Sequence, residues 1–249
     1  MVKELLFNTQ DKPLQLVVTV KAPYGAMVRF SGINADPGKI NSAYFTLQKH
    51  IKDLGTVTFP MPFTPAQLLL TVEANTPLEI VESKPLIQII EANIFELSAL
   101  KKEKLYLSQM TKDFIRHAVE FAEEAGFSQP GMTYSNDKGE FPILYFQNLQ
   151  GTTTPARIHK RTGEIQISAA KFRKMTVPMR IFILLHEWAH WYKRSGNEIE
   201  CDLFAARIFL GLGFPRYEAM SAVTEVLTDH PDHVERAVKL REFIREYRD

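Results

Sequence analysis

The sequence predicts a protein of the α+β class, in which an all-β, sandwich-like module at residues 1–97 precedes an α+β domain at residues 98–249. Two observations predict this division. Runs rich in β-branched residues, separated by turn residues, fill the first part of the chain. After about residue 95, apolar residues recur mostly at helical spacings, interrupted by two hairpin patterns. Sheet and helix are therefore expected to occupy different parts of the chain.

The first part of the chain contains six short runs that are typical of strands. They cover residues 14–20, 27–30, 43–47, 56–59, 68–73 and 85–90. Turn residues separate them, including Pro23 and Gly25 after the first run. Short strands at this spacing are typical of a sandwich or a small barrel. This part carries no catalytic signature, so we interpret residues 1–97 as an interaction or assembly module.

The second part of the chain is expected to place a small sheet before most of its helices. A helical pattern covers residues 95–127, and two hairpins follow at 132–148 and 156–168, with turns at 136–139 and 161–163. Four further helices are expected at 178–193, 198–211, 215–228 and 231–247.

The composition limits the partners and the compartment of the protein. The formal net charge of the 249 residues is +1 and there is no long basic block, so nothing indicates a specific nucleic-acid partner. The single cysteine, Cys201, excludes an internal disulfide and fits a reducing compartment. No signal-peptide pattern is present, and no apolar run reaches the roughly 20 residues that span a bilayer. We therefore expect no membrane partner, and a cytoplasmic location, or a virion if the chain is phage-encoded.

The strongest chemical signal is the segment His186-Glu187-Trp-Ala-His190 inside the helix expected at 178–193. Residues four apart on a helix lie on one face, so both imidazoles can bind one tetrahedral Zn²⁺. The neighbouring Glu187 can reach a water on the metal without being a ligand, and it is the candidate catalytic base. The alternative is two histidines one turn apart with no metal.

A second acidic motif follows twelve residues after His186, and Glu198 can complete a three-ligand set that leaves one position open for water. Asp202 shares its helical face and can accept the second ring N–H of a ligand histidine. Glu200 is the rival third ligand, although it would point about 200° around the helix from Glu198. Cys201 could be a thiolate ligand or a small buried apolar residue.

His-Glu-x-x-His followed by Glu198-Ile-Glu-Cys-Asp202-Leu-Phe-Ala-Ala resembles the motif pair of gluzincin metallopeptidases, especially the minigluzincins of bacteria, phages and mobile elements. The resemblance covers roughly residues 150–247, and Cys201 stands where that family usually has Ala. It implies a zincin-like domain in which Glu198 is the third zinc ligand and Asp202 belongs to the same motif. It also implies that a sheet edge near the metal helix binds peptide; the strand at 164–168 is the candidate, and a plain hairpin is equally consistent.

Taken together, the sequence predicts a zinc-dependent peptidase that hydrolyses peptide bonds in a peptide or protein substrate. The alternative is a phage virion structural or assembly protein that keeps a peptidase-like fold and contacts other subunits through its N-terminal module. A metal-dependent regulator is a third hypothesis, although no DNA-binding motif supports it. Tyr192 and Arg194 could stabilise an oxyanion, but no fixed spacing distinguishes them from ordinary structural residues.

Overall fold

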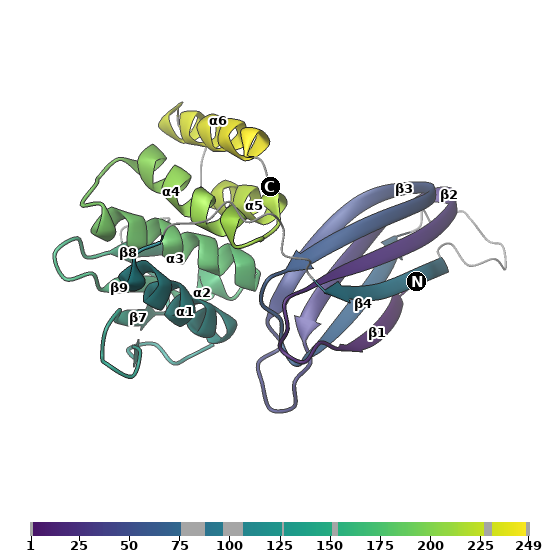
Figure 1. Cartoon of the computed structure of the whole chain (residues 1–249), viewed down its shortest axis with the longest axis horizontal. Coiled ribbons are helices and arrows are strands. Elements are labelled where there is room, and N and C mark those ends of the chain that lie inside the picture. The colour runs from purple at the N-terminus through teal and green to yellow at the C-terminus, as the bar shows by residue number, and fades with distance from the viewer. Residues whose placement is uncertain are drawn as a thin grey trace. The chain divides into compact units, whose positions relative to one another are not determined.

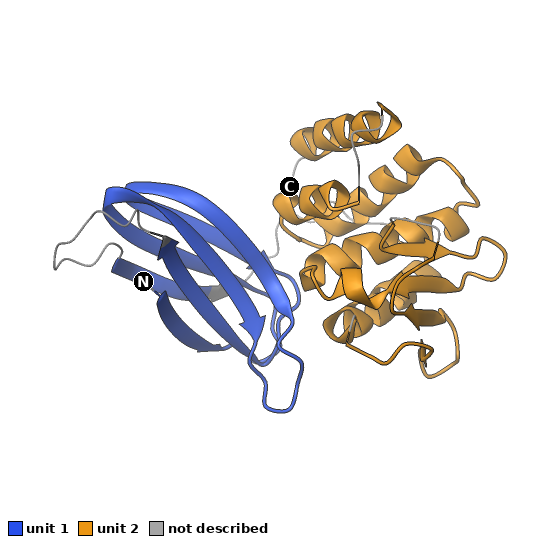
Figure 2. Cartoon of the chain, turned by 180° about the vertical axis from the view of Figure 1, so that it is seen from behind, with its two compact units in different colours: residues 1–100 blue, residues 101–249 orange. Residues whose placement is uncertain are grey.

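The computed structural model describes residues 2–75, 88–96, 107–125, 127–150, 154–226 and 231–247. The chain divides into two compact units, Met1–Leu100 and Lys101–Asp249 (Figure 2). The predicted boundary after residue 97 lies outside the described residues. The α+β class is confirmed, because the first unit is an antiparallel sheet and the described helices belong to the second. None of the described helices is long and apolar enough to cross a membrane.

One antiparallel sheet forms the first unit. Its strands are β1 (Val2–Asn8), β2 (Leu14–Asn34), β3 (Ala43–Met61), β4 (Gln67–Asn75) and β5 (Gln88–Glu96). The order is β1-β4-β2-β3, and β5 also pairs with β2. The long strand β2 is shared: residues 14–21 pair with β5, and residues 27–34 pair with β4. Two different parts of the sheet are therefore built on one strand (Figure 1).

The sheet bends back on itself to enclose its own core. Phe45 and Phe59 lie fourteen positions apart on β3, which would separate them by roughly 46 Å in a straight strand. Their rings instead stack with centroids 4.0 Å apart, and Phe30 of β2 lies 5.8 Å from Phe59. Gly32 makes room for this contact, because a Cβ there would lie 2.3 Å from the Phe45 ring. The sandwich-like arrangement thus comes from a single folded sheet.

Several predicted boundaries in the first unit are wrong. Residues 14–20 and 27–30 belong to one continuous strand, and the expected turn at Pro23 and Gly25 is a bulge between Ala22 and Ala26. Residues 43–47 and 56–59 likewise belong to the single strand β3, and strand β1 was not predicted. The helix expected from residue 95 does not begin there, because β5 continues through Glu96. Residues 85–87 of the last predicted strand lie outside the described residues.

The second unit combines a four-stranded sheet with helices (Figure 1). The strands are β6 (Thr133–Tyr134), β7 (Ile143–Phe146), β8 (Ala156–Ile158) and β9 (Ile165–Ser168). Both predicted hairpins are confirmed, since β6 pairs antiparallel with β7 and β8 with β9. The order β6-β7-β9-β8 places β8 at an edge and β9 inside the sheet. The strand at 164–168 is therefore not the free edge that we expected, and β8 takes that place.

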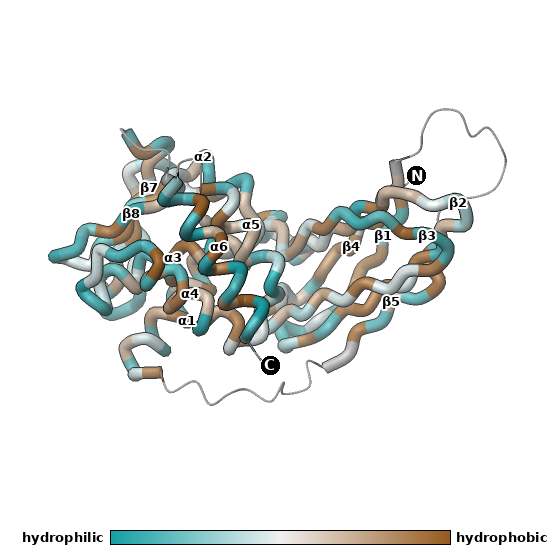
Figure 3. The backbone as a smooth tube through the Cα atoms, turned by 90° about the horizontal axis from the view of Figure 1, so that it is seen from above, coloured by the Kyte–Doolittle hydropathy of each residue, from teal (hydrophilic) through white to brown (hydrophobic). Residues whose placement is uncertain are grey.

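The helix predicted at 95–127 begins only at Gln109, but the four other predicted helices match described ones closely. The described helices of this unit are six in number. They are α1 (Gln109–Glu124), α2 (Ala169–Phe172), α3 (Val177–Tyr192), α4 (Glu198–Gly211), α5 (Arg216–Thr224) and α6 (Pro231–Glu246). The short helix α2 was not predicted. Figure 3 shows hydrophobic and hydrophilic residues alternating along α6, whose buried residues include Leu240 and Ile244.

Helix α3 is the centre of the second unit. It packs against α1, α4, α5 and β8, and its residues from Val177 to His190 are buried. Thr176 caps its first turn by accepting the Met179 N–H. The buried Arg180 guanidinium donates to the carbonyl oxygens of Phe172 at 2.9 Å and Ala122 at 2.7 Å. These contacts fix the helix that carries both motif histidines.

Candidate metal centre

The two motif histidines meet at their Nε2 atoms. His186 and His190 lie one turn apart on α3, and their Nε2 atoms are 3.1 Å apart. The rings are nearly perpendicular, at 82°. Both residues are largely buried, with 9 % and 6 % of their surface exposed. This pairing was predicted from the spacing of four.

Glu198 supplies the third group. Its Oε2 lies 3.3 Å from His186 Nε2, and its Oε1 lies 3.4 Å from His190 Nε2. It is the first residue of α4, and this start is fixed by Asn197, whose side chain accepts the Glu200 N–H at 3.1 Å. The rival Glu200 points elsewhere, to Lys193 Nζ at 2.8 Å and Ser195 Oγ at 2.7 Å. Of the two acids, only Glu198 joins the histidines.

The far side of each imidazole ring is also held. His186 Nδ1 lies 2.8 Å from Asp202 Oδ1, and His190 Nδ1 lies 2.9 Å from the Ser195 carbonyl oxygen. In the neutral form of each ring, such an acceptor favours the tautomer with its proton on Nδ1, which leaves the Nε2 lone pair free to bind a cation.

In that form, two lone pairs and a carboxylate face one another and repel unless a proton or a metal ion lies among them. The donor atoms of His186, His190 and Glu198 all lie within 4.8 Å of one another, a group that could hold a metal ion. The set of two imidazoles and one carboxylate fits a divalent transition metal such as Zn²⁺.

Cys201 lies beside this cluster without joining it. Its Sγ is 3.3 Å from His190 Nδ1, on the side of the ring that already contacts the Ser195 carbonyl. The side chain is fully buried, and its sulfur is not part of the converging donor set. The placement favours the interpretation of Cys201 as a small buried residue.

Arg236 of α6 is a site residue that the sequence analysis missed. Its Nε and Nη2 lie 2.9 and 3.1 Å from the two Asp202 carboxylate oxygens, and its Nη1 lies 3.1 Å from Glu198 Oε2. The sequence contains one pattern that indicates a buried role for Arg236. Arg236 lies four positions before Leu240 and eight before Ile244, which places a cation on the buried face of an amphipathic helix.

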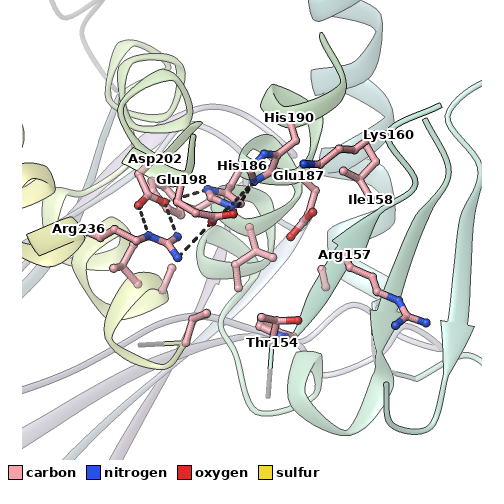
Figure 4. Close-up of a pocket in the computed structure, with 17 residues that line it drawn as sticks. Thr154, Arg157, Ile158, Lys160, His186, Glu187, His190, Glu198, Asp202 and Arg236 are labelled. Carbon is pink, nitrogen blue, oxygen red and sulfur yellow. Dashed lines mark hydrogen bonds and ion pairs between the residues drawn. The ribbon is translucent and has the colours of Figure 1, made fainter. Parts of the chain in front are cut away.

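Glu187 lies in a cavity of about 220 Å³ next to the cluster (Figure 4). Its side chain is buried, and the backbone N–H of Ile158 on the edge strand β8 hydrogen-bonds to its carboxylate. Strand β8 and its neighbours form one wall, and apolar side chains of α3 and α5 form another. These apolar lining residues are Phe182, Ile183, Ala222, Val223 and Val226. The cavity therefore joins a buried acid, the three-residue cluster and a strand edge.

The charges of the cluster reinforce one another. Burial opposes a charged His186, but contacts with Asp202 and Glu198 outweigh it and raise its pKa to about 9. Hydrogen bonds with Cys201 and Glu198 raise the pKa of His190 to about 11. The two histidines in turn hold the pKa of Glu198 far below its usual value. Burial raises the pKa of Glu187, even though the histidines lower it. The cluster thus favours positive charge between its donors.

Tyr192 and Arg194, the candidates for oxyanion stabilisation, do not line the cavity that contains Glu187. The Tyr192 hydroxyl donates to Ser108 Oγ at 3.2 Å, next to the N-terminus of α1. Both residues line a second cavity, which His190 also lines. Their placement gives no support to a role in stabilising an oxyanion.

No model of a protein family matches this chain, and comparisons with curated proteins and with solved structures likewise found no match. Any function assigned to the site therefore has to be argued from its geometry.

Proposed function

We propose that the chain is a zinc-dependent peptidase of the gluzincin type, with His186, His190 and Glu198 as the metal ligands and Glu187 as the general base. One observation carries the proposal: three donor groups converge within 4.8 Å beside a cavity that also contains a buried carboxylate and a free strand edge. A site that only stored a metal would not need the last two features.

The donor set supports a catalytic site more than a structural one. Structural zinc sites usually have four protein ligands, whereas catalytic sites have three and leave a position open. Here three groups converge, and the cavity lies directly beside them. A bound zinc ion would lower the pKa of water toward about 7 and polarise a substrate carbonyl.

The residues of the chain have distinct roles in this proposal. Glu187 takes a proton from the attacking water and passes it to the leaving amine, and the Ile158 N–H orients its carboxylate. The edge strand β8, whose outer side pairs with no other described strand, would lie alongside an extended peptide that crosses the cavity. Asp202 and the Ser195 carbonyl hold the ligand rings in orientation.

The proposal is tested with the full chain, zinc and a complex peptide mixture, whose cleavage products are read by mass spectrometry. Wild type should bind one zinc per chain and cleave peptides. Glu187→Gln should keep the zinc and lose cleavage by at least about a hundred-fold, because it removes the general base. Glu120→Gln, an exposed change on α1, is the matched control and should cleave like wild type.

Two results would overturn the proposal. Wild-type protein that binds no zinc, while Glu198 and both histidines are intact, would remove the metal site. Zinc-loaded Glu187→Gln that cleaves as fast as wild type would move the chemistry to other residues. Zinc binding without any cleavage by wild type would favour a protein that keeps the site for structure alone.

A further inference from the structure

We propose that the second cavity, which His190 also lines, is a subsite that selects substrates with acidic residues near the scissile bond. This inference rests on the proposed peptidase function and names its substrate class. The cavity has a volume of about 600 Å³. Its lining residues are Met110, Lys160, Arg161, His190, Trp191, Tyr192 and Arg194.

The second cavity adjoins the first. Lys160 and His190 line both, so a peptide long enough to extend past His190 can contact the two cavities at once. Figure 4 shows the Lys160 side chain extending from the end of β8 toward His190. An extended peptide paired with β8 would therefore contact Lys160 where it passes the end of the strand.

Among the residues that the structure describes, three cations and no acid line this cavity. Lys160, Arg161 and Arg194 are exposed, and none of them has an ion pair with any residue that the structure describes. Of the two acids that follow Arg194, Glu198 faces His186 and His190, and Glu200 is paired with Lys193 at 2.8 Å. Since the whole chain has a net charge of only +1, this local excess of positive charge is not a general property of the protein. It is available for a negatively charged ligand.

The turn between β8 and β9 holds two of the cations in place. Gly163 ends this turn with φ +77°, and its N–H donates to the His159 carbonyl oxygen at 2.9 Å. A Cβ at Gly163 would lie 3.1 Å from the Trp191 ring, so the turn packs directly on the end of α3. Lys160 and Arg161 are thereby placed beside Arg194, which follows the same helix.

The chemistry of the lining favours a peptide over a small inorganic anion. Trp191, Tyr192 and Met110 supply apolar surface beside the charges, which suits the carbon chain of Glu or Asp as well as the carboxylate. The adjoining edge of strand β8 can bind the backbone of a peptide. Together they fit a segment of chain with acidic side chains.

The test measures binding separately from cleavage. Zinc-loaded Glu187→Gln is titrated with a fluorescent peptide that contains four Glu residues, and with the same peptide in which Gln replaces each Glu. The Glu peptide should bind about ten-fold tighter, and the difference should vanish near 1 M salt, where charges are screened beyond about 3 Å. Adding Lys160→Glu and Arg161→Glu should weaken only the Glu peptide, by about ten-fold.

Lys138→Glu and Lys174→Glu form the charge-matched control, because both lysines are exposed and line neither cavity. Equal binding of the two peptides, or equal weakening by both double variants, would overturn the subsite. In zinc-loaded wild type, cleavage sites in a peptide mixture should be enriched in Asp and Glu on one side of the scissile bond. Selective binding without any cleavage would leave the subsite standing and refute the peptidase.

Discussion

The guanidinium of Arg236 holds the carboxylate of Asp202 through two contacts, Nε to Oδ2 at 2.9 Å and Nη2 to Oδ1 at 3.1 Å. The same Asp202 lies 2.8 Å from His186 Nδ1, so the arginine fixes the group that orients a proposed metal ligand. Its Nη1 also contacts Glu198 Oε2 at 3.1 Å. One cation thus restrains the two acids that α4 contributes to the site.

Arg236→Met should therefore weaken zinc binding. Removing the guanidinium leaves Asp202 buried without its cation and frees Glu198 to move, and losses of 10–100-fold in metal affinity are typical of such outer partners. Competition with a zinc chelator at fixed pH measures the change. Arg241→Met on the exposed face of the same helix is the control, and an equal effect of both variants would contradict this role.

Glu198→Ala should weaken zinc binding by more than Arg236→Met does. The first variant removes a ligand atom, whereas the second removes only a side chain that holds Glu198 and Asp202 in place. Glu200→Ala, two positions along the same helix, should leave zinc affinity unchanged, since Glu200 contacts Lys193 and Ser195 instead. The same chelator competition measures both. If the Glu200 variant lost zinc and the Glu198 variant kept it, the ligand assignment would be reversed.

Glu218 should make the protein less stable as the pH rises. Its carboxyl is buried at the start of α5, where burial raises its pKa to about 7, although the Thr176 hydroxyl donates to it at 2.6 Å. Between pH 4.5 and 7 the unfolded chain loses this proton and the folded chain keeps it. The free energy of unfolding therefore falls by at most about 1.4 kcal/mol per pH unit in this window.

The measurement is urea unfolding across pH 4.5–8 for wild type and Glu218→Gln. The free energy of unfolding of the glutamine variant should lack this part of the pH dependence. The variant should therefore become more stable relative to wild type as the pH approaches 8. Glu225→Gln, an exposed change at the end of the same helix, should keep the wild-type slope. If the free energy of unfolding changed equally with pH in wild type and Glu218→Gln, the Glu218 carboxyl would not titrate between pH 4.5 and 8.

The folded sheet of the first unit should depend on the stacked pair Phe45 and Phe59. Phe59 is 1 % exposed and also touches Phe30, so Phe59→Ala should cost about 3–5 kcal/mol of unfolding free energy. Thr58→Ala, its exposed neighbour on β3, should change stability by less than about 0.5 kcal/mol. A loss under about 1 kcal/mol for Phe59→Ala would indicate that the two ends of β3 do not pack together in solution.

The local parts of the site could be predicted from the sequence, and the distant part could not. A spacing of four placed His186 and His190 on one face, and the spacing of four between Glu198 and Asp202 did the same on α4. Such relations depend only on helix geometry. Arg236 lies 34 positions after Asp202, and its contact depends on how α6 packs, which no local period encodes.

The fold shows the same limit. The bounds predicted for α4 match the structure, because Asn197 and the helical period mark them locally. In the first unit, Pro23 and Gly25 indicated a turn, but the chain passes through them as a bulge in β2. Even-numbered residues are buried both before and after that bulge, so the alternation that continues from Leu14 to Phe30 was the better guide. The bend of β3 and the pairing of β5 with β2 are long-range, and turn residues do not reveal them.

The contacts of Arg236 with both acids also limit how the site could be transplanted. The two motifs occupy α3 and α4, so that helix pair alone is the obvious segment to graft onto another scaffold. The graft would bring Asp202 with its carboxylate buried and no cation beside it, because its partner comes from α6. The recipient scaffold would have to supply a guanidinium from a third element, because the transplanted histidines would otherwise lose their orientation.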